Sequence, residues 1–134
     1  MKFPDWLCVI GDPGFRGDCP TEAAEQVTFF NQLAIQYPEI RRIAIHPRNE
    51  GKRTMAQAMR HKAEGMTDGA ADIIIPGKRA LVIELKRRDH TKSRFEPGQL
   101  EYLETCQRHG AFVFVALGWR AAMDAVEDWL NATR

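Results

Sequence analysis

The chain has 134 residues, of which 44% are hydrophobic and 28% are charged, and its formal net charge is +1. This length and composition predict one globular domain with a core of its own rather than two domains. The net charge identifies no partner, but basic residues gather in five stretches: Arg41-Arg42, Arg48–Arg53, Arg60–Lys62, Lys78-Arg79 and Lys86–Arg94. Such stretches are typical of proteins that bind a phosphate backbone, and a solvated surface gives the same pattern.

The cysteine count argues against a disulfide framework. Cys8, Cys19 and Cys106 are odd in number and contain no C-x-x-C pair, so a zinc site is not indicated either. The N-terminus opens no signal peptide, and no apolar run approaches the length of a membrane span. We therefore expect reduced cysteines in a cytoplasmic protein that does not contact a membrane.

Residues 1–20 form an N-terminal extension with three prolines and three glycines, in which Trp6–Ile10 can form a short strand or pack on the core. Thr21 is a plausible N-cap for a helix that runs to about Tyr37 and is ended by Pro38. Its expected apolar face comprises Val27, Phe30, Leu33, Ala34 and Tyr37.

A short buried strand is expected at Ile43–Ile45, followed by a polar, basic loop over His46–Arg53. Thr54–Gln57 has the form of a capping box and predicts the start of a helix that Gly65 closes.

Two apolar runs, Ala71–Ile75 and Ala80–Leu85, flank the turn-forming residues Pro76–Arg79 and predict neighbouring strands. His90–Phe95 reads as a charged loop.

Pro97 is expected in the first turn of a helix that lasts until Gly110. Ala111–Leu117 is almost wholly apolar, as in a strand covered on both faces. A last helix after Gly118 would point these residues inward: Ala122, Met123, Val126, Trp129 and Leu130. The order of elements predicts a three-layer α/β domain with a mixed sheet.

Asp72, Glu84 and Lys86 are the residues of these strands that indicate chemistry. Side chains alternate between the two faces of a strand, so Glu84 and Lys86 point the same way. Charged groups at the end of an apolar strand are costly unless they pair or bind a ligand. With Asp72 on the adjacent strand, two carboxylates and a lysine can converge on one point. The arrangement suits a divalent metal ion and a water that attacks a phosphodiester.

Hydrolysis of a phosphodiester needs an activated water and neutralisation of charge, and Mg²⁺ or Mn²⁺ held by hard oxygen ligands supplies much of both. We expect Asp72 and Glu84 to be ligands, with the backbone carbonyl of Leu85 as a third. Lys86 would orient or deprotonate the water, or stabilise the developing negative charge. The spacing alone is only moderately specific, because surface strands often contain Glu-x-Lys pairs.

Further motifs follow one another in a fixed order along the chain. They are Glu25-Gln26, the loop Ile45–Arg53, Lys62-Ala63-Glu64-Gly65, Gly69-Ala70-Ala71-Asp72, Ile83-Glu84-Leu85-Lys86 and Glu96-Pro97-Gly98-Gln99. With these motifs, the segment from Thr21 to Leu130 resembles the VRR-NUC branch of the PD-(D/E)XK nucleases, especially its small stand-alone phage-type members. The resemblance implies a restriction-endonuclease-like nuclease domain over residues 21–134.

The resemblance also implies roles for individual residues. Glu25 would be a further metal ligand, Lys86 the catalytic lysine, and Gln99 a site residue that positions water or phosphate. Taken without the resemblance, Glu25 reads better as a first-turn helix acid favoured by the helix dipole. Glu22, one turn earlier, is a weaker candidate for the same ligand role.

The chain departs from the pattern of that family at four positions. Ala71 stands where a proline usually precedes the aspartate, Glu96 replaces a serine cap, and Gly98 softens the first helical turn. Glu50 places a negative charge in a loop expected near DNA. None of these changes removes a catalytic group.

The resemblance implies a Mg²⁺-dependent DNA endonuclease, with Mn²⁺ as a substitute, that acts as a homodimer on branched DNA such as Holliday junctions. It implies a phage or prophage origin as well, and no small-molecule cofactor is expected. DNA contacts are expected from these loop residues: Arg48, Asn49, Lys52, Arg53, Arg87, Arg88 and Lys92. Two alternatives stay open, namely a nuclease acting on flap or linear duplex DNA and a catalytically silent DNA-binding module.

Overall fold

The computed structural model describes residues 1–47 and 53–133. Its elements in chain order are β1 (Cys8–Ile10), α1 (Glu22–Gln36), α2 (Pro38–Ile43), α3 (Met55–Ala63), β2 (Ile73–Ile75), β3 (Leu81–Lys86), the 3₁₀ helix η1 (His90–Lys92), α4 (Gln99–Arg108), β4 (Phe112–Leu117) and α5 (Trp119–Thr133). Arg48, Asn49 and Lys52, three of the predicted DNA contacts, lie outside the described residues.

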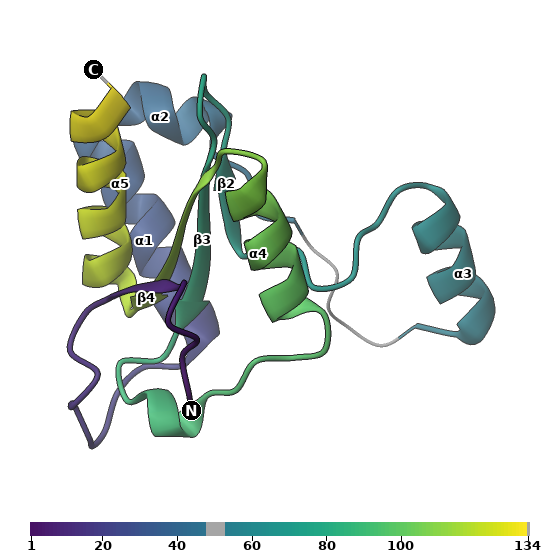
Figure 1. Cartoon of the computed structure of the whole chain (residues 1–134), viewed down its shortest axis with the longest axis horizontal. Helices are drawn as coiled ribbons and strands as arrows, with labels where there is room; N and C mark the ends of the chain where they lie inside the picture. The colour runs from purple at the N-terminus through teal and green to yellow at the C-terminus, as the bar shows by residue number, and fades with distance from the viewer. Residues whose placement is uncertain (48–52, 134) are drawn as a thin grey trace.

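A mixed sheet forms the centre of the molecule. Within the described residues it has four strands in the order β1-β4-β3-β2, and β2 alone runs antiparallel to its neighbour. In Figure 1 the helices α1 and α5 cover one face of the sheet and α4 covers the other. The predicted fold class, a three-layer α/β domain with a mixed sheet, is confirmed.

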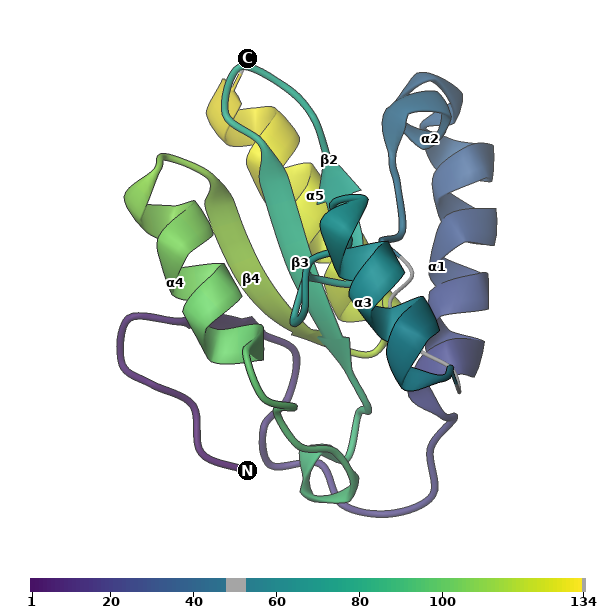
Figure 2. The same cartoon turned by 90° about the vertical axis from the view of Figure 1, so that its right-hand side faces the viewer.

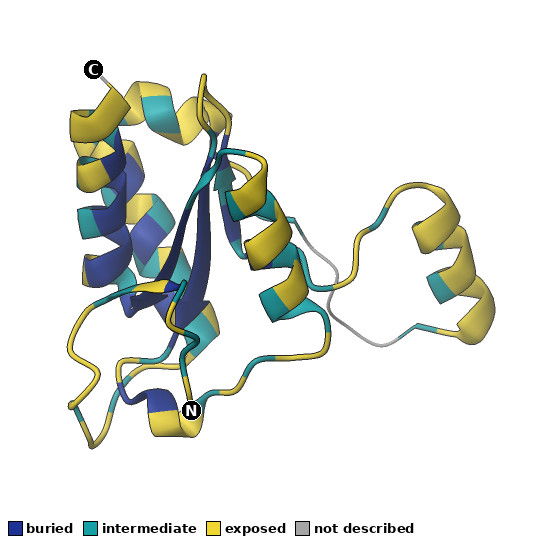
Figure 3. Cartoon of the chain, in the orientation of Figure 1, coloured by how far each residue is buried: buried dark blue, intermediate teal, exposed yellow. Residues whose placement is uncertain are grey.

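The central strands are buried on both faces. Every residue of β3 is buried, and β4 is buried from Val113 onward, as the dark strands of Figure 3 show. Side chains of β3 alternate, so Leu81, Ile83 and Leu85 pack with α1 and α5, whereas Val82 packs on the α4 side. Glu84 and Lys86 have the parity of Val82 and therefore point toward α4.

The first helix begins where the sequence predicts, with the Thr21 hydroxyl accepting a hydrogen bond from Ala24 N–H at 3.2 Å. The predicted inward face is confirmed at Leu33, and Phe30 and Tyr37 pack partly buried against the core, but the prediction is wrong at Val27 and Ala34 and misses Phe29. Phe29 and Leu33 are the fully buried apolar residues of α1, whereas Val27 is 62% exposed. Phe29 and Phe30 are adjacent, so the sequence pattern allows either of them to face the core. Only packing on the sheet decides which one does.

Two predicted boundaries are wrong at prolines. Pro38 begins α2 rather than only ending α1, so Ile43 is helical, and Ile45 makes only an isolated bridge to Ile74. Pro97 precedes α4, because Gly98 occupies the N-cap position in a left-handed conformation. A proline is favoured in the first turn of a helix, so its position alone does not tell a start from an end.

The helix α3 stands away from the sheet (Figure 1). It begins with the predicted capping box of Thr54 and Gln57, and Gly65, at φ +105°, follows its end. None of its residues, all of which are described, is buried. In the part of the chain that the structure describes, no helix is long and apolar enough to cross a membrane.

The N-terminal extension belongs to the fold. Its strand β1 pairs in parallel with β4, and Leu7 is buried on the α4 side of the sheet. Figure 2 shows this segment running beside η1 at one end of the sheet. Cys8, Cys19 and Cys106 are free thiols.

Candidate active site

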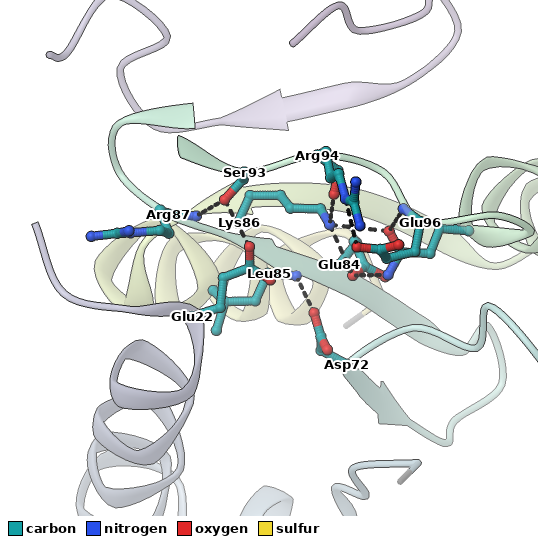
Figure 4. A network of polar contacts seen from close by, with 10 residues as sticks. Glu22, Asp72, Glu84, Leu85, Lys86, Arg87, Ser93, Arg94 and Glu96 are labelled. Carbon is teal, nitrogen blue, oxygen red and sulfur yellow. Dashed lines mark hydrogen bonds and ion pairs between the residues drawn. The ribbon is translucent and has the colours of Figure 1, made fainter. Parts of the chain in front are cut away.

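The strand register brings the predicted carboxylates together. Ile73 pairs with Ile83, so the antiparallel register continues to Asp72 opposite Glu84. Residues directly opposite in such a pair have Cβ atoms about 5 Å apart on the same face. The Asp72 Oδ2 atom also accepts a hydrogen bond from Leu85 N–H at 2.8 Å, which Figure 4 shows. Both contacts place Asp72 at the end of β3 that carries the charged residues.

Lys86 is fixed by a buried network. Its Nζ donates to Arg94 O at 2.7 Å and to Gln99 Oε1 at 3.0 Å, and lies 3.7 Å from Glu84 Oε1. Gln99 Nε2 donates in turn to Glu84 Oε1 at 3.1 Å. The side chains of Glu84 and Lys86 are only 1% and 2% exposed. The structure thus brings Asp72, Glu84, Lys86 and Gln99 into one cluster.

Two glycines hold Gln99 at this position. Gly98 precedes the helix with φ +89°, and Gly69 has φ +76°. A Cβ atom on Gly69 would lie 2.4 Å from the carbonyl carbon of Gly98 and 2.8 Å from Gln99 N. Only a glycine permits this approach. The loop that leads into Asp72 therefore packs directly on the start of α4, which presents Gln99.

The electrostatics of Glu84 favour a bound cation. Burial raises the pKa of Glu84 well above its ordinary value of 4.5, and the charge of Asp72 and a hydrogen bond between the two carboxyl groups raise it further. That hydrogen bond requires a proton on one of the two groups. When both are ionised, no donor among the described residues reaches the buried Glu84 Oε2. A buried carboxylate oxygen that no donor reaches is a place that a divalent cation can occupy.

Glu22, rather than Glu25, faces this cluster. Glu22 lines the same cleft as Asp72 and Lys86, and its charge contributes to the raised pKa of Glu84. Its Oε2 accepts a hydrogen bond from the Ser93 hydroxyl at 2.7 Å (Figure 4).

Glu25 is directed elsewhere. It is 2% exposed, and its Oε2 accepts a hydrogen bond from Trp119 N–H at the start of α5. A carboxylate at that position stabilises the exposed N–H groups of a helix N-terminus. The structure therefore does not bring Glu25 to Asp72 and Glu84, and the ligand role that the resemblance implies for it lacks geometric support.

A signal in the sequence separates the two glutamates. Glu25, Phe29 and Leu33 are spaced by four residues and share one stripe of α1, which is the buried stripe. Once Phe29 is identified as a core residue, Glu25 falls on the buried stripe of α1 and Glu22 falls to one side of that stripe.

Four of the predicted basic DNA contacts lie in the described residues and have partners within the chain. Arg87 donates to Pro20 O at 3.0 Å and Cys19 O at 2.6 Å. The Arg88 guanidinium lies 4.2 Å from the centre of the Phe15 ring, and Lys92 donates to Gly17 O at 2.9 Å. Arg53 contacts the Met66 sulfur at 2.7 Å. The first three side chains thus hold the N-terminal extension, and their DNA contacts stay predictions.

Asp72 lies where three clefts meet. The largest has a volume of about 710 Å³ and is lined by Glu22, Asp72, Lys86, Thr91, Lys92, Ser93, Arg94, Glu96 and Gln99. A second extends along α1 toward Ala44, and a third lies between His46 and Pro97; both include Asp72. Solvent and an extended ligand can therefore reach Asp72, at the edge of the carboxylate cluster, from several directions.

No group of three or more His, Cys, Asp and Glu side chains within residues 1–47 and 53–133 is arranged to hold a metal ion. The carboxylate pair is nevertheless suited to one, because Glu84 Oε2 has no donor among these residues and the neighbouring carboxylates repel each other. The Leu85 carbonyl points to the same side as its N–H, toward Asp72. Asp72, Glu84 and this carbonyl form an oxygen donor set that fits Mg²⁺ or Mn²⁺.

Comparison with known proteins supports the fold. A solved structure of a VRR_NUC domain protein superposes with a TM-score of 0.70 and 22% sequence identity, covering 87% of this chain and 92% of that one. No protein-family model matches the sequence, and no curated protein matches it either. The chain thus has the fold of a VRR_NUC domain protein over nearly its whole length.

Proposed function

We propose that this protein is a divalent-metal-dependent DNA endonuclease that hydrolyses phosphodiester bonds. The observation that carries the proposal is the cluster of Asp72, Glu84, Lys86 and Gln99, in which no donor from the described part of the chain reaches the buried Glu84 Oε2. The fold supports it, because the similar solved structure is described as a VRR_NUC domain protein.

Asp72, Glu84 and the Leu85 carbonyl would hold Mg²⁺, with Mn²⁺ as a substitute, and Glu22, which lines the same cleft and whose charge acts on Glu84, would complete the set. When bound, the metal ion supplies positive charge against the scissile phosphate and lowers the pKa of a coordinated water. We prefer Glu22 to Glu25 for this role, because Glu25 is engaged by Trp119 N–H in the core.

The side chains would divide the remaining work. Lys86 Nζ, an ammonium with three donors, places a positive charge beside Glu84 and can orient the attacking water or stabilise charge on the phosphate. Gln99 accepts from Lys86 and donates to Glu84, so it fixes the relative position of the two groups. Arg94 supplies a backbone carbonyl that holds Nζ from the other side. A contribution of about 10²–10³-fold in rate is typical of a positioned donor that stabilises developing negative charge.

Branched DNA is the substrate that we propose, in particular four-way Holliday junctions, with the protein acting as a homodimer in the cytoplasm of a bacterial or phage-infected cell. A two-fold dimer presents two equivalent sites to two strands of a symmetric junction. The three clefts that meet at Asp72 leave room for strands to approach from different directions.

A cleavage assay tests this function. A four-way junction, a flap and a linear duplex of the same sequence are incubated with the protein and Mg²⁺ or Mn²⁺, beside Glu84→Ala and Lys86→Ala. Lys78→Ala is the matched control, because Lys78 is an exposed lysine in the turn before β3. We expect the junction to be cut fastest, with the losses confined to the two site variants.

Preference for linear duplex or flap would reject the junction as substrate while keeping the nuclease. Binding of DNA without cleavage in either metal would identify a silent DNA-binding module.

A further inference from the structure

The outer edge of β2 is paired through a single residue. Ile45 N–H donates to Ile74 O and Ile74 N–H donates to Ile45 O, each at 2.9 Å, in an antiparallel bridge. In an antiparallel ladder the next such pair lies two residues further along each strand, in opposite directions. That pair would join residues 47 and 72. Residue 47 is a proline, which has no N–H to donate. The ladder therefore cannot supply a backbone donor to the Asp72 carbonyl.

The His46 side chain supplies this donor. Its Nδ1 lies 2.7 Å from Asp72 O. A carbonyl oxygen only accepts, so Nδ1 must carry the hydrogen of this bond. The ring thus takes over the hydrogen bond that the backbone of residue 47 would make in a regular strand.

The bond fixes a residue on which the candidate site depends. On one side the Asp72 main chain is held by His46, and on the other side its Oδ2 accepts from Leu85 N–H at 2.8 Å. Both contacts lie at the point where β2 begins, since its regular pairing with β3 starts only at Ile73. The hydrogen bond from His46 therefore restrains the segment that leads into Ile73.

We propose that His46 is a positioning residue that holds Asp72 against Leu85 and opposite Glu84. It does so because Pro47 interrupts the edge ladder. Its consequence for catalysis rests on the proposed function, whereas the positioning itself is a property of the metal-free protein. Loss of the donor leaves the Asp72 carbonyl unpaired and lets the carboxylate move away from Leu85.

Three variants separate the donor from the bulk of the ring. His46→Leu keeps a side chain of similar bulk and removes the donor. His46→Asn keeps a donor, because the Asn amide nitrogen occupies a position similar to that of Nδ1. The double variant His46→Leu with Pro47→Ala restores the backbone N–H at residue 47, so that the ladder itself can supply the bond.

The measurement is amide hydrogen exchange in the metal-free protein, read at Leu85 with Val115 of the neighbouring strand as the reference for global opening. We expect Leu85 to exchange about 10-fold faster in His46→Leu and at the wild-type rate in the other two variants. Affinity for Mn²⁺, measured by calorimetry without DNA, should fall about 10–100-fold in His46→Leu and recover in the same two variants.

An unchanged Leu85 exchange rate in His46→Leu would overturn the proposal. So would a faster rate that neither His46→Asn nor the added Pro47→Ala reverses, since the ring would then act through packing alone. Should His46→Leu fail to fold, His46→Asn is compared with His46→Gln, whose amide reaches toward the position of Nε2 instead. Equal exchange at Leu85 in these two variants would likewise overturn it. If the exchange rates change as expected but the wild-type protein cuts no DNA, the proposed function is rejected and the positioning role of His46 stands.

Discussion

Glu22 and Glu25 lie less than one helical turn apart on α1, yet their carboxylates have different surroundings. Glu25 is buried and bonded to the first N–H of α5, whereas Glu22 is half-buried in the cleft that contains Asp72 and Lys86. Helical residues three apart differ by about 60° in direction. That rotation is enough to place one carboxylate in the core and the other at the candidate site.

Replacing each glutamate by glutamine should therefore give opposite results. Glu22→Gln should weaken Mn²⁺ binding and slow cleavage by about 10–100-fold, because a carboxylate near the metal is lost while the fold is kept. Glu25→Gln should lower the free energy of unfolding by about 1 kcal/mol, because the charged acceptor at the N-terminus of α5 is lost. Its metal affinity should stay at the wild-type value.

Calorimetry with Mn²⁺ and urea unfolding of both variants check this prediction. A loss of metal affinity in Glu25→Gln with wild-type affinity in Glu22→Gln would restore Glu25 as the ligand. The two substitutions are matched in size, charge and helix, so each serves as the control for the other.

Among the elements, the N-terminal extension and the segment around η1 depend on each other. Asp89 is buried and accepts hydrogen bonds from Gly17 N–H at 3.0 Å and from Thr91 N–H at 3.1 Å. His90 Nε2 lies 2.9 Å from Pro13 O. The same segment leads on to Arg94, whose carbonyl accepts from Lys86. Residues far apart in sequence thus support the lysine of the candidate site indirectly.

Acid should weaken this attachment through Asp89. The hydrogen bond from the Thr91 hydroxyl, followed by that from Gly17 N–H, lowers the pKa of Asp89 from 3.8 to about 2. A carboxyl group whose pKa is lowered by folding stabilises the fold at every pH above the pKa that it has in the unfolded chain. This stability is lost as the pH falls through the pKa of the folded state. The contribution of Asp89 is therefore complete above about pH 4 and disappears between about pH 4 and pH 2.

Asp89→Asn should be less stable than the wild type at pH 7, because an amide nitrogen cannot accept from Gly17 N–H. The difference in free energy of unfolding should shrink when urea titrations are repeated at pH 3. Asp18→Asn, at an exposed position in the same extension, is the control. A difference that stays constant from pH 7 to pH 3 would contradict the role given to Asp89.

At the scale of the whole molecule, the sequence predicts the central strands and the capped helices well. The runs that became β3 and β4 are apolar at nearly every position, which is the pattern of strands buried on two faces. Capping at Thr21 and Thr54 depends on neighbouring residues alone, so both helix starts were predictable. The parity of Glu84 and Lys86 follows from strand geometry in the same way.

What could not be predicted depends on contacts between distant segments. The phase of α1 is decided by packing on the sheet, and the side chains of Arg87 and Lys92 meet carbonyls about 70 residues away. No local pattern marks a backbone carbonyl as a partner. The bridge at Ile45 is likewise set by the edge of β2 and not by a run of strand residues.

The raised pKa of Glu84 gives the metal-free protein a stability that depends on pH. An acid whose pKa is raised by folding stabilises the fold fully when the pH is below its pKa in the unfolded chain, which is near 4.5 here. This stability is lost as the pH rises through the pKa of the folded state. At neutral pH the metal-free wild type therefore bears a cost for the buried carboxyl group beside Asp72 that it does not bear at pH 4.5. Glu84→Gln bears none of it.

We expect metal-free Glu84→Gln to unfold at a higher temperature than the wild type at pH 7.5, with the gap closing as the pH approaches 4.5. Mg²⁺ at 100 times its dissociation constant should stabilise the wild type by about 2.7 kcal/mol, since it binds only the folded protein, and Glu84→Gln much less. Thermal unfolding with and without Mg²⁺ measures both effects, and exposed Glu101→Gln is the control. If metal-free Glu84→Gln were no more stable than the wild type at any pH, the surrounding donors would already satisfy this carboxylate. A gain from Mg²⁺ equal in both proteins would place the cation elsewhere, because the candidate site depends on the Glu84 oxygen that no described residue donates to.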